Sequence, residues 1–260
     1  MKRWTALTAL IFIALSSVNA RALVVVGQNY EPYYFHDGTS GINGACYEIV
    51  QRLCSFEKAH CKFKFAPVRR FMAMLKTGEA DVGCPLGRSA PRETAFHMHT
   101  LFRARYAFFG LPEATHKIKS YTDLNGLKVG VLSPAMTEIS LQRIHEFTDK
   151  AFTIEPEKTI FNSLLKAKKK AYALAYGNRD VALRWIEKTR SKLREVPELG
   201  EPVAYSIAFS KKNIDEKRFQ KIQQYLSVLH KDGTLEQIAR KYRLTPAEHF
   251  SYPQVTDPNP

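Results

Sequence analysis

Short apolar segments rich in β-branched residues alternate along the chain with amphipathic segments, and this alternation restricts the fold more than any other feature. Leu23 to Gly27 (LVVVG) is expected to be a buried strand of a parallel sheet. The sequence then predicts a helix for Cys46 to Phe56, a strand for Phe63 to Pro67 and a helix for Phe71 to Thr77. Gly78 is expected to end that helix as a left-handed cap. Strands and helices in this order predict an α/β fold.

A second α/β unit is predicted to begin near residue 121. Its first strand is expected at Lys128 to Leu132, and Ser133 and Pro134 are favoured at the N-cap and first position of the helix that follows. The polar residues 113–120 are expected to connect the two units. Further strands are predicted at 152–154, 171–176 and 202–209, with 204–209 as the return crossing, and helices near 160–169, 179–193 and 215–243.

Both ends of the chain are expected to lie outside this fold. Lys2 and Arg3 precede an apolar run, and small residues then offer a cleavage site after Ala20 or Ala22, which is the pattern of a signal peptide. A buried N-terminal helix is the alternative. We therefore expect residues 1–22 to be a signal peptide, the mature protein to be periplasmic, and the proline-containing residues 245–260 to form a flexible tail.

The chain carries a net charge of +14. A basic protein can bind nucleic acid, but export argues against such a partner, and the Lys and Arg residues are scattered along predicted helices. Solvated helix faces are therefore the favoured explanation. An anionic solute or an acidic partner in the cell envelope is the alternative.

Export would place the four cysteines in an oxidising compartment. Cys54 and Cys61 enclose six residues between the end of a helix and the start of the next strand, so we predict that they form a disulfide. Cys46 and Cys54 lie two turns apart on one predicted helix, about 12 Å, which is too far for a disulfide. Cys46 could pair with Cys84 only if both line the same cleft, and the sequence leaves that pairing open.

The segment Gly78 to Arg92 (GEADVGCPLGRSAPR) is expected to form one wall of a binding cleft. Its short apolar part, Ala80 to Val82, leads into a predicted loop of small residues that ends at Arg92. The guanidinium of arginine is a planar fork of donors that suits a carboxylate. An aromatic loop, Tyr30 to Phe35, follows the first strand, and ligands of open α/β sheets gather at such strand ends.

Four stretches of the chain match a known pattern in their order and spacing. They are Tyr30-x-Pro32-Tyr33, Leu75-x-x-Gly78-x-x-Asp81, Asp123-Leu124-x-Gly126-x-Lys128-Val129-Gly130-Val131 and Asp232-Gly233-Thr234-x-x-x-Ile238-x-x-Lys241-Tyr242. With these stretches the chain resembles the family 3 extracellular solute-binding proteins, which are amino-acid-type periplasmic receptors of ABC importers.

The resemblance implies a two-lobed periplasmic binding protein type II fold. Each lobe would be a mixed sheet flanked by helices, with the solute in the cleft between the lobes. Lobe one would hold residues 23–108 and 204–244, and lobe two residues 109–203. The resemblance also implies a monomer with no cofactor, metal or catalytic residue, which delivers its solute to an ABC permease. It further supports the pairing of Cys54 with Cys61.

The resemblance implies specific roles for residues of the cleft. Tyr30 and Tyr33 would stack on the solute, Gly87 and Ser89 would offer donors, and Arg92 would grip a carboxylate. Alternatively, the two tyrosines are ordinary core aromatics, Gly87 and Ser89 form a simple turn, and Arg92 is a surface residue. The full set of expected ligand-binding residues is Tyr30, Tyr33, Arg70, Gly87, Ser89, Arg92, Ser133, Thr137 and Tyr176.

Departures from the family pattern affect the expected solute. Pro134-Ala135-Met136 stands where amino-acid receptors carry Gly-Thr-Thr, and Ala175 or Tyr176 stands where they carry the Asp that pairs an α-ammonium. A buried ammonium without that carboxylate would be costly. An aromatic, anionic or otherwise atypical small solute therefore suits the sequence at least as well as an ordinary amino acid.

Two other classes of function compete with solute binding. A few proteins with this fold are periplasmic dehydratases of cyclic acids, for which Glu31 and Glu48 are the candidate acids here, although neither has an identifiable partner. A docking or sensory module is the other class. The sequence contains no G-x-S-x-G, P-loop or H-E-x-x-H motif.

Overall fold

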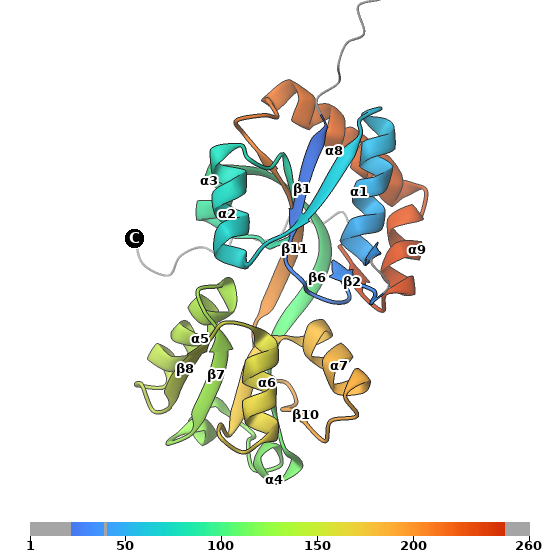
Figure 1. The fold of residues 1–260 in the computed structure, drawn as a ribbon. Coiled ribbons are helices and arrows are strands. Elements are labelled where there is room, and N and C mark those ends of the chain that lie inside the picture. Colours follow the sequence, from blue (N-terminus) through green and yellow to red (C-terminus); the bar gives the residue numbers. More distant parts are fainter. Residues whose placement is uncertain (1–21, 39–40, 248–260) are drawn as a thin grey trace, which may run out of the picture.

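A single mixed sheet runs through both halves of the molecule (Figure 1). The computed structural model describes residues 22–38 and 41–247. Within these ranges ten strands form the sheet, and its main path is β4-β1-β5-β11-β6-β9-β7-β8. The predicted signal peptide, apart from residue 22, and residues 248–260 of the predicted tail lie outside the described residues.

The elements alternate as the sequence predicts. The strands are β1 (Leu23–Gly27), β2 (Phe35–His36), β3 (Ile42–Asn43), β4 (Cys61–Phe65), β5 (Val82–Gly87), β6 (Phe96–Gly110), β7 (Lys128–Leu132), β8 (Thr153–Glu157), β9 (Leu174–Asn178), β10 (Arg194–Glu195), β11 (Pro202–Ser210) and β12 (Thr245–Pro246). The helices are α1 (Ala45–Phe56), α2 (Val68–Thr77), α3 (Ala90–Ala95), α4 (Pro112–Thr115), α5 (Met136–Phe147), α6 (Ile160–Lys168), α7 (Arg179–Lys188), α8 (Glu216–Lys231) and α9 (Thr234–Lys241), with a 3-10 turn at Tyr121–Leu124. Among the described residues, none of these helices is long and apolar enough to cross a bilayer.

Lobe one is the half of the molecule built on β4, β1, β5 and β11. The central strand β1 pairs in parallel with β4 and β5, because α1 and α2 each return the chain to the same end of the sheet. Gly83 of β5 leaves room for Phe71 and Leu75 of α2, whose rings and methyl groups would otherwise collide with a side chain there. The apolar side of α2 therefore rests directly on the sheet.

Lobe two is the half built on β9, β7 and β8. Strand β7 pairs in parallel with both neighbours, and its residues Val129 to Leu132 are buried. Helices α5, α6 and α7 contact these strands. The two lobes together confirm the predicted two-lobed α/β fold.

The lobes are joined by β6 and β11. Strand β6 is 15 residues long; it pairs with β11 from Phe96 to Arg105 and with β9 from Tyr106 to Gly110. The chain thus crosses between lobes inside a hydrogen-bonded strand. The prediction that residues 113–120 connect the lobes was wrong, because α4 in that segment already packs on β6 and β10 within lobe two.

Other predicted boundaries also differ from the structure. Val82–Gly87 is a buried strand rather than the start of a loop, because it pairs with both β1 and β11. Strand β4 begins at Cys61, two residues earlier than predicted. Helix α5 begins at Met136 rather than after Ser133, whose N–H extends the pairing of β7 by donating to the carbonyl of Glu157 at 2.9 Å. Thr245–Pro246, placed in the flexible tail, pairs with β6 as β12.

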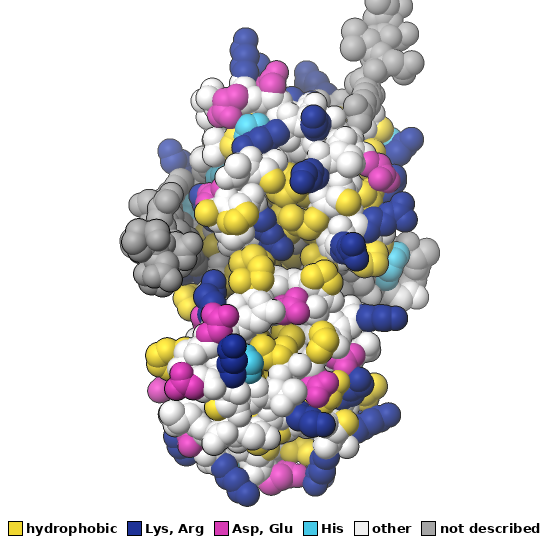
Figure 2. Space-filling model, turned by 90° about the vertical axis from the view of Figure 1, so that its left-hand side faces the viewer, with side chains coloured by type: hydrophobic (Ala, Val, Ile, Leu, Met, Phe, Trp, Pro, Cys, Tyr) yellow, Lys and Arg dark blue, Asp and Glu magenta, His cyan; other side chains and the backbone are white. Residues whose placement is uncertain are grey.

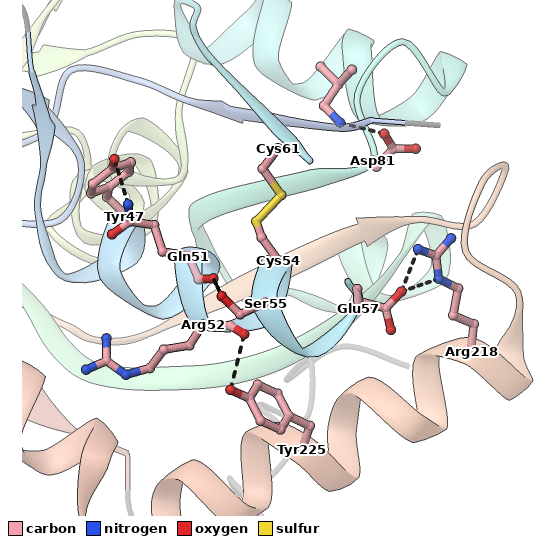
Figure 3. Close-up of a disulfide and its surroundings, with 11 residues drawn as sticks. Tyr47, Gln51, Arg52, Cys54, Ser55, Glu57, Cys61, Asp81, Arg218 and Tyr225 are labelled. Carbon is pink, nitrogen blue, oxygen red and sulfur yellow. Dashed lines mark hydrogen bonds and ion pairs between the residues drawn. A yellow bond between two sulfur atoms is a disulfide. The ribbon is translucent and has the colours of Figure 1, made fainter. Parts of the chain in front are cut away.

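Two disulfides tie lobe one together. The predicted Cys54–Cys61 bond is confirmed, and it links the last turn of α1 to the first residue of β4 (Figure 3). The same part of α1 is held to α8 by the ion pair of Glu57 with Arg218 (Figure 3). The pairing that the sequence left open, Cys46–Cys84, is also formed, with 5.7 Å between the Cα atoms. It joins the start of α1 to β5.

Gly44, just before α1, occupies a backbone position that suits glycine alone. Its φ and ψ are 122° and 163°, and a Cβ there would lie 2.3 Å from the carbonyl oxygen of Tyr33. We expect Gly44→Ala to lower the free energy of unfolding by about 2–4 kcal/mol through backbone strain and this collision. Urea denaturation measures the change.

Gly126→Ala is the matched control. Gly126 also has a positive φ, 73°, but a Cβ added there would have open space around it to a distance of 4 Å. Its cost should be only about 1 kcal/mol, that of a left-handed alanine. Equal losses in the two variants would show that the contact with Tyr33 is unimportant.

Candidate functional site

A small cavity lies between the lobes, in front of the two crossing strands. Its volume is about 30 Å³, which is room for water but not for an amino acid. The cavity lies where strand ends of both lobes meet helix starts. Its walls are formed by Gln28, Tyr30, Val68, Pro85, Leu86, Gly87, Arg92, Tyr106, Leu132, Ala135, Met136, Thr137 and Tyr205.

Arg92 supplies the positive charge of the cavity. It lies on the short helix α3, and its Nη1 donates to the carbonyl of Gly87 at 2.8 Å. In the described part of the chain no carboxylate pairs with it, and burial lowers the pKa of its guanidinium. A Cβ at Gly87 would lie 3.3 Å from this Nη1 and 3.4 Å from the hydroxyl of Tyr106. The missing side chain at Gly87 thus lets the guanidinium and a phenol converge.

Three tyrosines form the wall next to Arg92. Tyr30 comes from the loop after β1, Tyr106 from β6 and Tyr205 from β11, and each is at most 5% exposed. The hydroxyls of Tyr30 and Tyr205 are 3.4 Å apart. Burial raises the pKa of all three phenols far above the usual value. They are therefore neutral and offer hydroxyl groups, not negative charge.

The structure places four of the nine expected ligand-binding residues on the cavity wall. They are Tyr30, Gly87, Arg92 and Thr137. The hydroxyl of Thr137 donates to the carbonyl of Leu132 at 3.2 Å, so it also fixes the start of α5.

The other five lie away from the cavity wall. Tyr33 is fully buried beneath Tyr205. Arg70 is on the solvent side of α2, 71% exposed and 3.8 Å from Glu79, because α2 turns Phe71 and Leu75 to the sheet. Ser89 caps α3, Ser133 extends the pairing of β7, and the hydroxyl of Tyr176 is 2.7 Å from that of Ser140 inside lobe two.

Sequence reasoning missed the tyrosines of the crossing strands. Tyr106 and Tyr205 are on β6 and β11, and they face the cavity because both strands pass directly behind it. An available signal was the position of Tyr205 within the predicted return crossing, since a crossing strand must pass the cleft. Gln28 and Met136 were also missed as wall residues.

A group of polar contacts joins the lobes beside the tyrosines. Glu31 of lobe one accepts from Arg184 Nε at 3.0 Å and from Lys188 Nζ at 2.6 Å, both on α7 of lobe two. The hydroxyl of Tyr33 donates to Asp180 Oδ2 at 2.7 Å. These contacts border a second, larger cavity of about 830 Å³ whose wall carries charges of both signs. The lobes are therefore in direct contact in this structure.

Comparison with known proteins places the chain among binding proteins. Residues 23–245 match the model of the bacterial extracellular solute-binding proteins, family 3. The probable amino-acid-binding protein YxeM of Bacillus subtilis (strain 168) is 26% identical, over 93% of this chain and 95% of the relative.

Two solved structures share the fold. An ancestral arginine-binding protein bound to arginine has a TM-score of 0.76 at 21% identity, with 85% of this chain and 97% of that chain covered. A histidine kinase sensor domain with similarity to periplasmic binding proteins has a TM-score of 0.76 at 20% identity, with 88% and 99% covered.

The buried tyrosines predict alkaline instability. Burial raises the pKa of Tyr30, Tyr33, Tyr106 and Tyr205 in the folded state above the pKa of the same phenols in the unfolded chain. Each neutral, buried phenol therefore makes its full contribution to folding stability below the unfolded-state pKa, and this contribution is lost as the pH rises above that pKa. Each phenol should remove about 1.4 kcal/mol of folding stability per pH unit above about pH 10. Tyrosinate absorbance during an alkaline titration, compared with circular dichroism, should show these phenols ionising only as the fold is lost.

Tyr106→Phe provides the control for this titration. Exposed tyrosines ionise in an early absorbance step, and buried tyrosines ionise in a late step when the fold is lost. The variant should reduce the late step by the absorbance of one phenol and leave the early step unchanged. A smaller early step in the variant would contradict the burial of Tyr106.

Proposed function

Because the chain belongs to the bacterial extracellular solute-binding proteins of family 3, we propose that it captures a small polar solute, an amino acid or a related organic anion, in the periplasm. The two lobes would close over the solute, and the closed form would deliver it to an ABC-type importer. Membership of the family and the name of the relative from Bacillus subtilis support this proposal.

The main support for the proposal is that Arg92 is partly buried and has no carboxylate partner among the described residues. Its guanidinium lies at the cavity and is bonded to one carbonyl. An arginine fork in such a place favours a ligand with a carboxylate, which would form charge-assisted hydrogen bonds with it. The neutral hydroxyls of Tyr30 and Tyr106 lie on the same wall and can hydrogen-bond the same ligand.

Entry of a solute requires the lobes to separate, since the present cavity is too small for one. The contacts of Glu31 and Tyr33 with α7 would break when the lobes part and form again when they close. A solute that contacts both Arg92 of lobe one and Met136 or Thr137 of lobe two would favour the closed form by its differential affinity. Closure would then report occupancy to a membrane partner.

The two acids considered for a dehydratase are engaged elsewhere. Glu31 is held by Arg184 and Lys188, and Glu48 by Lys241 and Tyr242. Neither glutamate lines the small cavity at Arg92, although Glu31 lines the larger one. This arrangement favours binding over catalysis at Arg92.

A ligand screen tests the proposal. Purified protein would be screened by thermal shift against amino acids, organic anions, amines and aromatic acids, and hits would be measured by isothermal titration calorimetry. We expect at least one carboxylate to bind, and Arg92→Met to weaken that binding by about 100-fold, because it leaves the buried carboxylate unpaired.

Arg70→Met is the matched control, since Arg70 has the same side chain in the same lobe but lies at the surface. This variant should bind as the unchanged protein does. Absence of any hit from a folded, ligand-free sample would overturn the proposal, as would a hit that Arg92→Met does not weaken.

A further inference from the structure

The charge of the interlobe cavity is unbalanced. Of the described residues on its wall, Arg92 is the one that carries a charge, and no Asp or Glu is among them. The phenols of Tyr30, Tyr106 and Tyr205 are neutral, because burial raises the pKa of each. A bound monoanion would therefore neutralise the cavity. A zwitterion would leave one uncompensated positive charge in it.

Two carboxylates outside this wall, Asp180 and Glu201, already have hydrogen-bond partners. Asp180 accepts from the hydroxyl of Tyr33 at 2.7 Å and lines the larger, outer cavity instead. Glu201 accepts from Ser140 and from Arg143, both at 2.6 Å, within lobe two. An ammonium group beside Arg92 would thus have to take a carboxylate from an existing partner or stay without one, which is costly when it is buried.

Several apolar side chains also line the cavity. Val68 and Leu86 come from lobe one, and Leu132 and Met136 from lobe two. On the face shown in Figure 2, apolar side chains gather where the two lobes meet, whereas Lys and Arg are spread over both lobes. Such a wall stabilises an apolar group on the solute, since each buried CH₂ contributes about 0.8 kcal/mol.

We infer that the solute is a monocarboxylate with an apolar body and no ammonium group. This inference rests on the proposed function, because it names the solute class of the same site. The carboxylate would be held by Arg92 over Gly87, with the apolar body between Leu86 and Met136.

Matched ligands separate this inference from the proposed function. Calorimetry would compare 3-phenylpropanoate with L-phenylalanine, and 4-methylpentanoate with L-leucine, pairs that differ only in the α-ammonium group. We expect at least one of the two acids without the ammonium to bind about tenfold tighter or more than its amino acid. Phenethylamine, which lacks the carboxylate, should not bind, and propanoate should bind more weakly than the longer acids.

A charge added to the wall provides a second test. Met136 is the first residue of α5, where a carboxylate is tolerated by the helix dipole. Met136→Glu should reduce or reverse the preference for the acid over the amino acid, because it supplies the missing partner for an ammonium group. Met136→Gln has nearly the same shape without the charge and should keep the preference of the unchanged protein.

Each result decides the inference. Tighter binding of the amino acid in both pairs, with loss in Arg92→Met, would overturn the monocarboxylate assignment and leave the proposed function standing. Failure of both acids to bind would also overturn it. Failure of all ligands, here and in the wider screen, would overturn both proposals. A preference for the acids that Met136→Glu removes and Met136→Gln keeps would support the inference.

Discussion

The pairing of β6 with β11 is the constraint on which the two lobes depend. Nine residues of β11 find partners on β6, and β6 then continues into lobe two as the partner of β9. Backbone hydrogen bonds along both crossing strands hold the lobes to one sheet, so movement of one lobe relative to the other must twist these strands. The register of the pair shifts between Tyr205 and Ser206, and β6 changes partner between Arg105 and Tyr106. Both irregularities lie behind the interlobe cavity.

The electrostatic character of the site follows from this placement. Neutral, buried tyrosines of the crossing strands lie on the same wall as the partly buried Arg92, and no acid on this wall among the described residues matches its charge. In such surroundings a charge interacts strongly with whatever ion approaches. The ion pairs across the lobes, Glu31 with Arg184 and Lys188, involve no residue of this cavity wall. Under the proposed function, binding and closure would therefore use separate groups of charges.

The sequence predicted the fold better than the site. Short apolar runs indicated β1 and β7, and amphipathic periodicity indicated most of the helices, because both patterns reflect burial within a single element. Strand β5 escaped prediction, since Gly83, Pro85 and Gly87 have the composition of a loop and pair only through tertiary contacts. Arg92 could be assigned to the cleft because it ends the predicted loop and matches the family resemblance. The solvent-facing side of α2 at Arg70, and the approach of Tyr205 to Tyr30, depend on how separate elements pack and could not be predicted.

Tyr106 and Tyr205 belong at once to the crossing strands and to the cavity wall. Under the proposed function, a substitution at either position would therefore change two quantities together, the contacts offered to a solute and the energy difference between open and closed lobes. Observed affinity is the product of intrinsic affinity and the fraction of molecules in the competent form. A change of solute selectivity at these two tyrosines would therefore also shift the equilibrium between open and closed lobes. Val68, Leu132 and Met136 lie on the wall but outside the crossing strands, so substitutions there would change the solute contacts with less effect on that equilibrium.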